Sequence, residues 1–239
     1  MSASEWKMKC EEEWGLQGAP MPDSVDWKSV YEARPLGRNL LKNPSPHGFS
    51  KDMPPPNPER KWSMERYFHH PSEVDFSSWN ISREYLPRDR SGIPSTAVVC
   101  GWTSQIWLSM EQIVDLKEEG LWDELLDEFQ PEIVIQDWYE ESRMNEHIYE
   151  LHVKLLGAEN DTVIAEHSVR PTEDLNSDSY IWKEVSHVFS GYGPGVRYIH
   201  FQHRLKEKVG EGIARGFHKT LVTDSSVIVR PTKTSSQSS

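Results

Sequence analysis

The sequence predicts an all-β protein, an antiparallel β-sandwich of about ten strands with one short helical insert. Most of the chain consists of short segments rich in β-branched and aromatic residues, separated by Gly, Asn, Asp or Pro. Several of these segments alternate apolar and polar side chains, as strands with one buried face do. Only one stretch, which is acidic, has apolar residues at helical spacing over more than one turn. These patterns favour two packed sheets over a helical bundle.

The expected strands follow one another from residue 61 to residue 230. They cover Lys61–Phe68, Trp79–Tyr85, Thr96–Trp107, Ile133–Glu140, Ile148–Leu156, Thr162–Val169, Tyr180–Phe189, Val196–Gln202 and Val227–Arg230. In 148–156, Tyr149, Leu151, Val153 and Leu155 fall on one face. The glycine-rich segment 191–195 is expected to form a tight hairpin connection.

The helical insert is expected over residues 109–129. Ser109 and Gln112 resemble a capping box, an apolar helical stripe follows them, and Pro131 closes the insert. Residues 111–141 hold twelve acidic side chains and one lysine, which is most of the formal net charge of −12. We interpret this region as a solvated helical face, with an acidic docking patch as the alternative.

The N-terminal part leads into a basic string, RPLGRNLLKNP, at residues 34–44. Residues 1–26 are polar, and either remain flexible or place a tryptophan on the domain; a short helix is expected at 27–32. In the basic string, we expect the two leucines to plug the sandwich while Arg38 and Asn39 satisfy backbone groups at its base. Residues 43–60 read as a long proline-rich surface loop, with a polyproline ligand as the alternative.

Composition excludes several functions. The net charge of −12 argues against nucleic-acid and anionic-membrane partners. No apolar run approaches the roughly 18 residues of a membrane span, and no signal peptide opens the chain. Cys10 and Cys100 are expected to be free thiols, because two cysteines make neither a disulfide framework nor a zinc site. We therefore expect a cytoplasmic protein without metal or cofactor.

The tryptophans and histidines are assigned ordinary roles. Trp62, Trp79, Trp138 and Trp182 are expected to fill the space between the sheets. The histidines show no metal-ligand spacing, and the sequence lacks the G-x-S-x-G, H-E-x-x-H and phosphate-loop motifs. An enzymatic activity is not expected.

Several strings, in order over residues 27–230, resemble the F-box-associated (FBA) domain family. Besides residues 34–44 they are 114–127 (VDLKEEGLWDELLD), 131–139 (PEIVIQDWY), 182–203 and 222–227. The resemblance implies a jelly-roll or galactose-binding-like sandwich that reads substrates or partners, related to SCF ubiquitin-ligase substrate receptors. It divides the chain into a polar segment 1–26 without a recognisable F-box, an FBA domain 27–231 and a disordered tail 232–239. Binding of a Skp-type adaptor is accordingly not expected.

One branch of this family binds the chitobiose core of N-glycans through stacked aromatic side chains. The resemblance places that branch's Tyr-Trp pair at Ile213 and Ala214, which offer no stacking face, and its other aromatic at Trp102 or Gly101. Glycan binding is therefore expected to be lost. The ligand-contacting positions implied are Trp102, Ile213, Ala214, Arg215, Phe217 and His218.

The same region is basic. Arg204, Lys206, Lys208 and Lys219 are expected to form a loop that contacts an acidic protein partner, with a solvated flexible loop as the alternative. The function expected is non-enzymatic recognition of a protein, glycosylated or not, in the glycoprotein quality-control branch. The alternatives are a cytotoxic-cell surface receptor for a target antigen in innate immunity and an N-glycan-binding lectin-like module.

Overall fold

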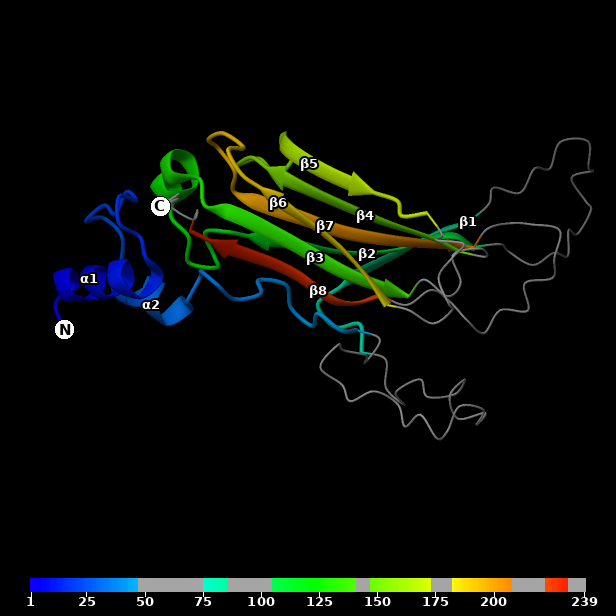
Figure 1. Cartoon of the computed structure of the whole chain (residues 1–239), viewed down its shortest axis with the longest axis horizontal. Coiled ribbons are helices and arrows are strands. Elements are labelled where there is room, and N and C mark those ends of the chain that lie inside the picture. Colours follow the sequence, from blue (N-terminus) through cyan, green and yellow to red (C-terminus); the bar gives the residue numbers. More distant parts are fainter. Residues whose placement is uncertain (47–74, 86–104, 141–146, 173–181, 208–221, 232–239) are drawn as a thin grey trace, which may run out of the picture.

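The computed structural model describes residues 1–46, 75–85, 105–140, 147–172, 182–207 and 222–231 (Figure 1). Within them, antiparallel strands form a five-stranded sheet of order β1-β2-β7-β4-β5 and a three-stranded sheet of order β6-β3-β8. The strands are β1 Asn80–Tyr85, β2 Gln105–Asp115, β3 Glu132–Glu140, β4 His147–Leu156, β5 Val163–Val169, β6 Trp182–Phe189, β7 Tyr198–Glu207 and β8 Val222–Arg230. The predicted all-β sandwich is confirmed.

The core lies between the two sheets. Ile133 and Ile135 of β3 are fully buried, as is the predicted face of β4, Tyr149, Leu151, Val153 and Leu155. Burial of these alternate side chains removes a large apolar area from water, at about 25 cal/mol per Å². The alternation predicted for β4 is thus confirmed.

The tryptophans do not all share that core. Trp79 is buried as expected and stacks on His203, with ring centroids 4.8 Å apart. Trp138 is only half-buried, because it follows the inward-facing Asp137 on β3 and so lies on the opposite face of the sheet. Trp62 and the side chain of Trp182 lie outside the described residues.

The N-terminal segment folds onto the domain as two helices, α1 Ala3–Trp14 and α2 Trp27–Ala33. Ser2 and Glu5 form a capping box on α1, and Asp26 caps α2. Trp27 packs edge-on against Trp122, with ring centroids 4.9 Å apart. Cys10 and Leu16, within residues 1–26, are fully buried in the hydrophobic core, and Trp6 and Trp14 pack against it, so this segment places tryptophans on the domain.

The basic string at residues 34–44 closes the sandwich, as predicted. Leu40 and Leu41 are 2% and 4% exposed. The Asn39 side chain donates to the carbonyl of Ser225 at 2.9 Å and accepts from the amides of Leu41 and Val227, both at 3.0 Å. Arg38 donates to the carbonyls of residues 33 and 34 and to the Glu119 carboxylate.

The helix predicted from residue 109 is wrong for its first half. Residues 109–115 belong to β2, where Met110 and Val114 are buried and Ile113 is exposed. The apolar spacing also fits a period of two, and pairing with β7 satisfies the backbone. Within the predicted insert, helical structure is confined to residues 123–129, a short helical turn that includes the π-helix Leu125–Phe129.

The acidic region is consequently not a solvated helical face. Asp137 is fully buried, Glu119 pairs with Arg38, and Asp127 pairs with Arg197 at 2.8 Å. These carboxylates join elements that are far apart in the sequence.

The segment 191–195 is not a hairpin connection, because β6 and β7 lie in different sheets. It is held by the helical turn instead. The Tyr192 hydroxyl donates to the carbonyl of Pro131, and the Gly195 amide donates to the Asp127 carboxylate at 2.8 Å. Gly191, Gly193 and Gly195 have positive φ angles, which suit this crossing between sheets. The predictions for residues 61–68, 96–104 and 232–239 and for most of the proline-rich loop lie outside the described residues.

Candidate functional site

The sandwich has two unlike ends. The strand pairs Glu140–Trp182, Tyr139–Val222 and His147–Glu207 place several strand termini at one end, together with the pair Tyr85–Gln105. These termini lie opposite α1 and α2 in Figure 1, and we call this the loop end. We call the end that carries the helices and residues 190–197 the closed end.

Most of the predicted site residues lie outside the described residues: Trp102, Lys208, Ile213, Ala214, Arg215, Phe217, His218 and Lys219. The chain segments that contain them begin or end at Gln105, Glu207 and Val222, all at the loop end. Arg204 and Lys206 are described. Both belong to β7, so their placement in a loop was wrong, and they are held on a sheet.

Arg204 and Lys206 flank an aromatic ring that sequence reasoning did not single out. The guanidinium carbon of Arg204 lies 4.3 Å from the centroid of the Trp107 ring, and Nζ of Lys206 lies 5.5 Å from it. Leu205, between them, is buried, as is Leu108, its partner on β2. Trp107, Arg204 and Lys206 therefore lie on the outer face of the five-stranded sheet.

A buried carboxylate helps to position Arg204. Glu150 of β4 is 6% exposed, accepts from His152 at 2.9 Å and from Nε of Arg170 at 2.6 Å, and lies 3.9 Å from Arg204. Burial opposes ionisation of Glu150, but the hydrogen bonds from His152 and Arg170 outweigh it and lower its pKa. The carboxylate is therefore charged at neutral pH.

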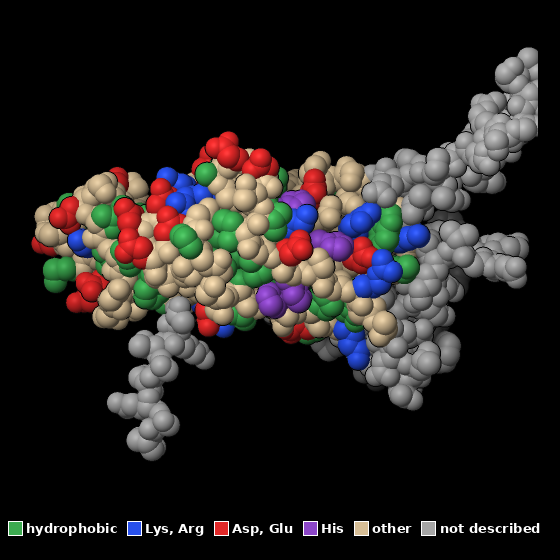
Figure 2. All heavy atoms as spheres, turned by 90° about the horizontal axis from the view of Figure 1, so that it is seen from above, with side chains coloured by type: hydrophobic (Ala, Val, Ile, Leu, Met, Phe, Trp, Pro, Cys, Tyr) green, Lys and Arg blue, Asp and Glu red, His purple; other side chains and the backbone are tan. Residues whose placement is uncertain are grey.

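We call Trp107, Glu150, Arg170, Arg204 and Lys206 the basic–aromatic patch. Arg170 and Arg204 flank the Glu150 carboxylate and Lys206 lies beside Trp107, so these five side chains carry a net positive charge on a protein whose formal net charge is −12. On the face seen in Figure 2, many Lys and Arg side chains gather toward the loop end. Cations held over an aromatic ring offer both charge and a flat apolar surface. The arrangement can bind an acidic or aromatic group of a partner.

A second polar cluster lies between the sheets near the loop end. The Asp137 carboxylate accepts from the Tyr149 hydroxyl at 2.5 Å and the Ser225 hydroxyl at 2.7 Å, and lies 3.1 Å from Nδ1 of His203. Burial and the adjacent Asp137 charge raise the pKa of Tyr149 well above its ordinary value. We call Asp137, Tyr149, His203 and Ser225 the buried cluster.

The buried cluster is not a hydrolytic triad. Ser225 donates to Asp137 and not to Nε2 of His203, which has no hydrogen-bond partner in the described part of the chain. A base that does not contact the hydroxyl cannot activate it. The four side chains are at most 1% exposed, so substrate has no access. The cluster instead links β3 and β8 of one sheet to β4 and β7 of the other.

The described ranges contain no group of three or more His, Cys, Asp or Glu side chains that could hold a metal ion. Among the helices they contain, none is long and apolar enough to cross a membrane.

Comparisons with known proteins agree on the family. The family model "F-box associated region" matches residues 31–229. The chain is 54% identical over 238 residues to F-box only protein 50 of Danio rerio, covering 98% of this chain and 99% of that protein. It is 41% identical over 225 residues to F-box only protein 50 of Homo sapiens, covering 92% and 72%. It is 35% identical over 231 residues to F-box only protein 2 of Bos taurus, covering 95% and 70%. The chain therefore belongs to the F-box-associated domain family.

Proposed function

We propose that this protein is a non-enzymatic recognition module that binds a protein partner at the loop end of its sandwich. The observation that carries the proposal is the basic–aromatic patch, which places Arg204 and Lys206 beside Trp107 on a rigid sheet next to several strand termini. Sites built on strands hold their side chains more precisely than sites built on loops alone. Positive charge on an acidic protein favours an acidic partner surface.

The family and the names of the relatives support a role related to SCF ubiquitin-ligase substrate receptors and ubiquitin-dependent protein catabolism. We further propose that the protein acts in the cytoplasm and, within the family, is most similar to nonspecific cytotoxic cell receptor protein 1. Positions 213 and 214 are Ile and Ala, so glycan stacking is not part of the proposed recognition, whether or not the partner is a glycoprotein.

The direct test reverses the charge of the patch. The Arg204→Glu/Lys206→Glu variant should lose partners that proximity labelling by the full chain detects in cells, roughly tenfold or more in labelling ratio. The Lys28→Glu/Lys117→Glu variant makes the same charge change at exposed positions of the closed end and should keep them. Equal labelling by all three proteins would contradict recognition at the loop end.

Three further measurements separate the finer parts of the proposal. A pull-down with purified Skp adaptor tests the relation to the ligase; no association removes that relation but leaves partner recognition intact. A glycan array tests the lectin alternative, and a chitobiose signal abolished by Trp102→Ala would establish it. Cell fractionation tests the surface-receptor alternative, which requires the protein in the plasma-membrane fraction.

A further inference from the structure

In the part of the chain that the structure describes, strand β2 has a free edge at the closed end of the five-stranded sheet. Its pairing with β1 ends at Asn80 and Glu111, whereas its pairing with β7 continues to Asp115. Among the described residues, no strand or isolated bridge pairs with Gln112–Asp115 on the β1 side. An unpaired edge presents backbone N–H and C=O groups that can pair with another chain.

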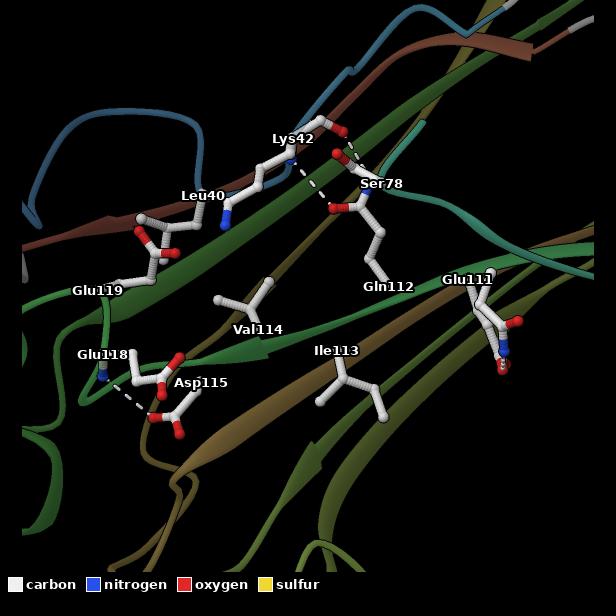
Figure 3. Close-up of a pocket in the computed structure, with 11 residues that line it drawn as sticks. Leu40, Lys42, Ser78, Glu111, Gln112, Ile113, Val114, Asp115, Glu118 and Glu119 are labelled. Carbon is white, nitrogen blue, oxygen red and sulfur yellow. Dashed lines mark hydrogen bonds between the residues drawn. The ribbon is translucent and has the colours of Figure 1, made fainter. Parts of the chain in front are cut away.

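A groove of about 480 Å³ lies along this edge (Figure 3). On one side, the Gln112 side chain bonds both backbone groups of Lys42, at 3.0 and 2.7 Å, which fixes that wall. The apolar side chains of Leu40 and Val114 lie at the base of the groove, and both are almost fully buried. Ile113 points to the other face of the sheet and is 53% exposed, although it is a large apolar side chain.

The groove is acidic. Glu111, Asp115, Glu118 and Glu119 line it, against one cation, Lys42. Glu119 pairs with Arg38, and Glu111 lies 2.8 Å from His200. Within the described ranges, neither Asp115 nor Glu118 has a cationic partner. Two carboxylates beside the free edge therefore remain available to a cation.

We propose that this groove binds an extended basic segment of another protein, which adds as an antiparallel strand along Gln112–Asp115. Strand addition supplies main-chain hydrogen bonds, and alternate side chains supply specificity. Alternate side chains of the added strand would point to opposite faces of the sheet, and a long basic side chain suits the groove that Asp115 and Glu118 line. A residue opposite Ile113 would lie beside that exposed side chain, where an apolar residue is favoured.

Charge complementarity decides between possible occupants. A second copy of this chain would place acidic residues 111–119 against one another, which costs free energy. A basic segment offsets those charges. The same acids could serve only to block edge-to-edge pairing, and that reading predicts no peptide binding at all.

The experiment uses the full chain and a fluorescein-labelled peptide, GKKVSG, with GEEVSG as its charge-reversed control. Fluorescence anisotropy should show binding of GKKVSG only. The Glu118→Lys and Ile113→Thr variants should each weaken it roughly fivefold or more, consistent with the worth of one exposed charge pair or apolar contact. Glu159→Lys makes the same charge reversal, and Val188→Thr replaces another exposed apolar side chain by Thr; both lie on other surfaces and should leave binding unchanged.

Hydrogen exchange locates the contact. The amides of Gln112–Asp115 should gain protection on addition of GKKVSG, while those of β6 should not. The inference is overturned if GKKVSG does not bind, or if the Glu118→Lys and Ile113→Thr variants both bind it as the wild type does. It is also overturned if the protected amides lie outside Gln112–Asp115. A dimer that sedimentation shows to depend on Ile113 would also overturn it. Arg204→Glu/Lys206→Glu should bind the peptide normally, so this test fails independently of the loop-end proposal.

Discussion

Polar side chains hold the fold together at both ends of the sandwich, but their exposure to water differs between the two ends. At the closed end, Arg38–Glu119 and Arg197–Asp127 remain partly accessible to water, with side-chain exposures of 37% and 18%, and of 16% and 29%. Near the loop end, the buried cluster around Asp137 has lost contact with water. Exposed pairs contribute little to stability, whereas a buried group left without its partners is costly. The loop end should therefore be the more sensitive to loss of a single polar group.

That difference bears on recognition. The buried cluster lies beneath the strands that carry Arg204 and Tyr139, so it fixes the relative position of the two sheets where their loop-end termini meet. A rigid base lets the segments attached to it differ among relatives while the sandwich stays the same. The family strings run along strands that reach both ends, whereas the proposed specificity lies at the loop end alone.

Removal of the Asp137 carboxylate should have the largest effect. Asp137→Ala leaves the Tyr149 and Ser225 hydroxyls and Nδ1 of His203 without their buried partner, and should lower the free energy of unfolding by about 3–5 kcal/mol. Urea unfolding followed by tryptophan fluorescence measures this. Asp137→Asn keeps an acceptor oxygen and should lose less. A loss below about 1 kcal/mol for Asp137→Ala would show that the cluster does not hold the sheets together.

Removal of the Asn39 side-chain amide should have the second-largest effect on stability. Asn39→Ala breaks two hydrogen bonds between the basic string and β8 and one within the string, and should cost about 2–3 kcal/mol, less than at Asp137, because the site is only partly buried. Asn80→Ala, which removes one exposed bond to Glu111, should stay within about 0.5 kcal/mol of wild type in the same urea experiment. If the Asn39 variant equals the Asn80 variant, closure by the string is not needed for stability.

The ion pair of Asp127 and Arg197 should give a smaller effect that depends on pH. The hydrogen bond from Arg197 lowers the pKa of Asp127 below its ordinary value of 3.8, against the opposing effect of burial. The stabilisation is therefore complete above that value and is lost as pH falls through the lowered folded-state pKa. Asp127→Asn should cost about 1 kcal/mol at neutral pH and flatten the acid limb of the stability curve. An unchanged acid limb would contradict the assignment.

The smallest effect is expected where β5 and β6 meet. His167 and His187 stack there with centroids 4.0 Å apart, and burial, followed by the His187 charge, lowers the pKa of His167. Stability from this pair is complete above the ordinary pKa of 6.5 and falls as the pH drops through the lowered folded value. His187→Phe should make the free energy of unfolding fall less between pH 7.5 and 5.5, with a difference from the wild type of less than about 1 kcal/mol. Melting temperatures at the two pH values measure it, and a larger decline in the variant would refute the interpretation.

Local pattern was sufficient where a strand has one plainly apolar face. The alternation in 148–156 located β4 and its buried side chains, and the string 34–44 indicated both its family and its role in closing the fold. The local pattern was insufficient to predict the strand at residues 109–115. Met110 and Val114 fit one face of a helix or one face of a strand equally well, and the choice depends on β7, which is distant in the sequence.

The sequence by itself determined the family, the all-β class and the identity of the closing string, because these depend on local residue order. The tertiary structure alone decided that 191–195 crosses between sheets, that Trp107 joins Arg204 and Lys206, and that Asp137 gathers its partners in the core. The physical reason is that these contacts join strands brought together by pairing and burial. No local pattern records which residues will meet across two sheets.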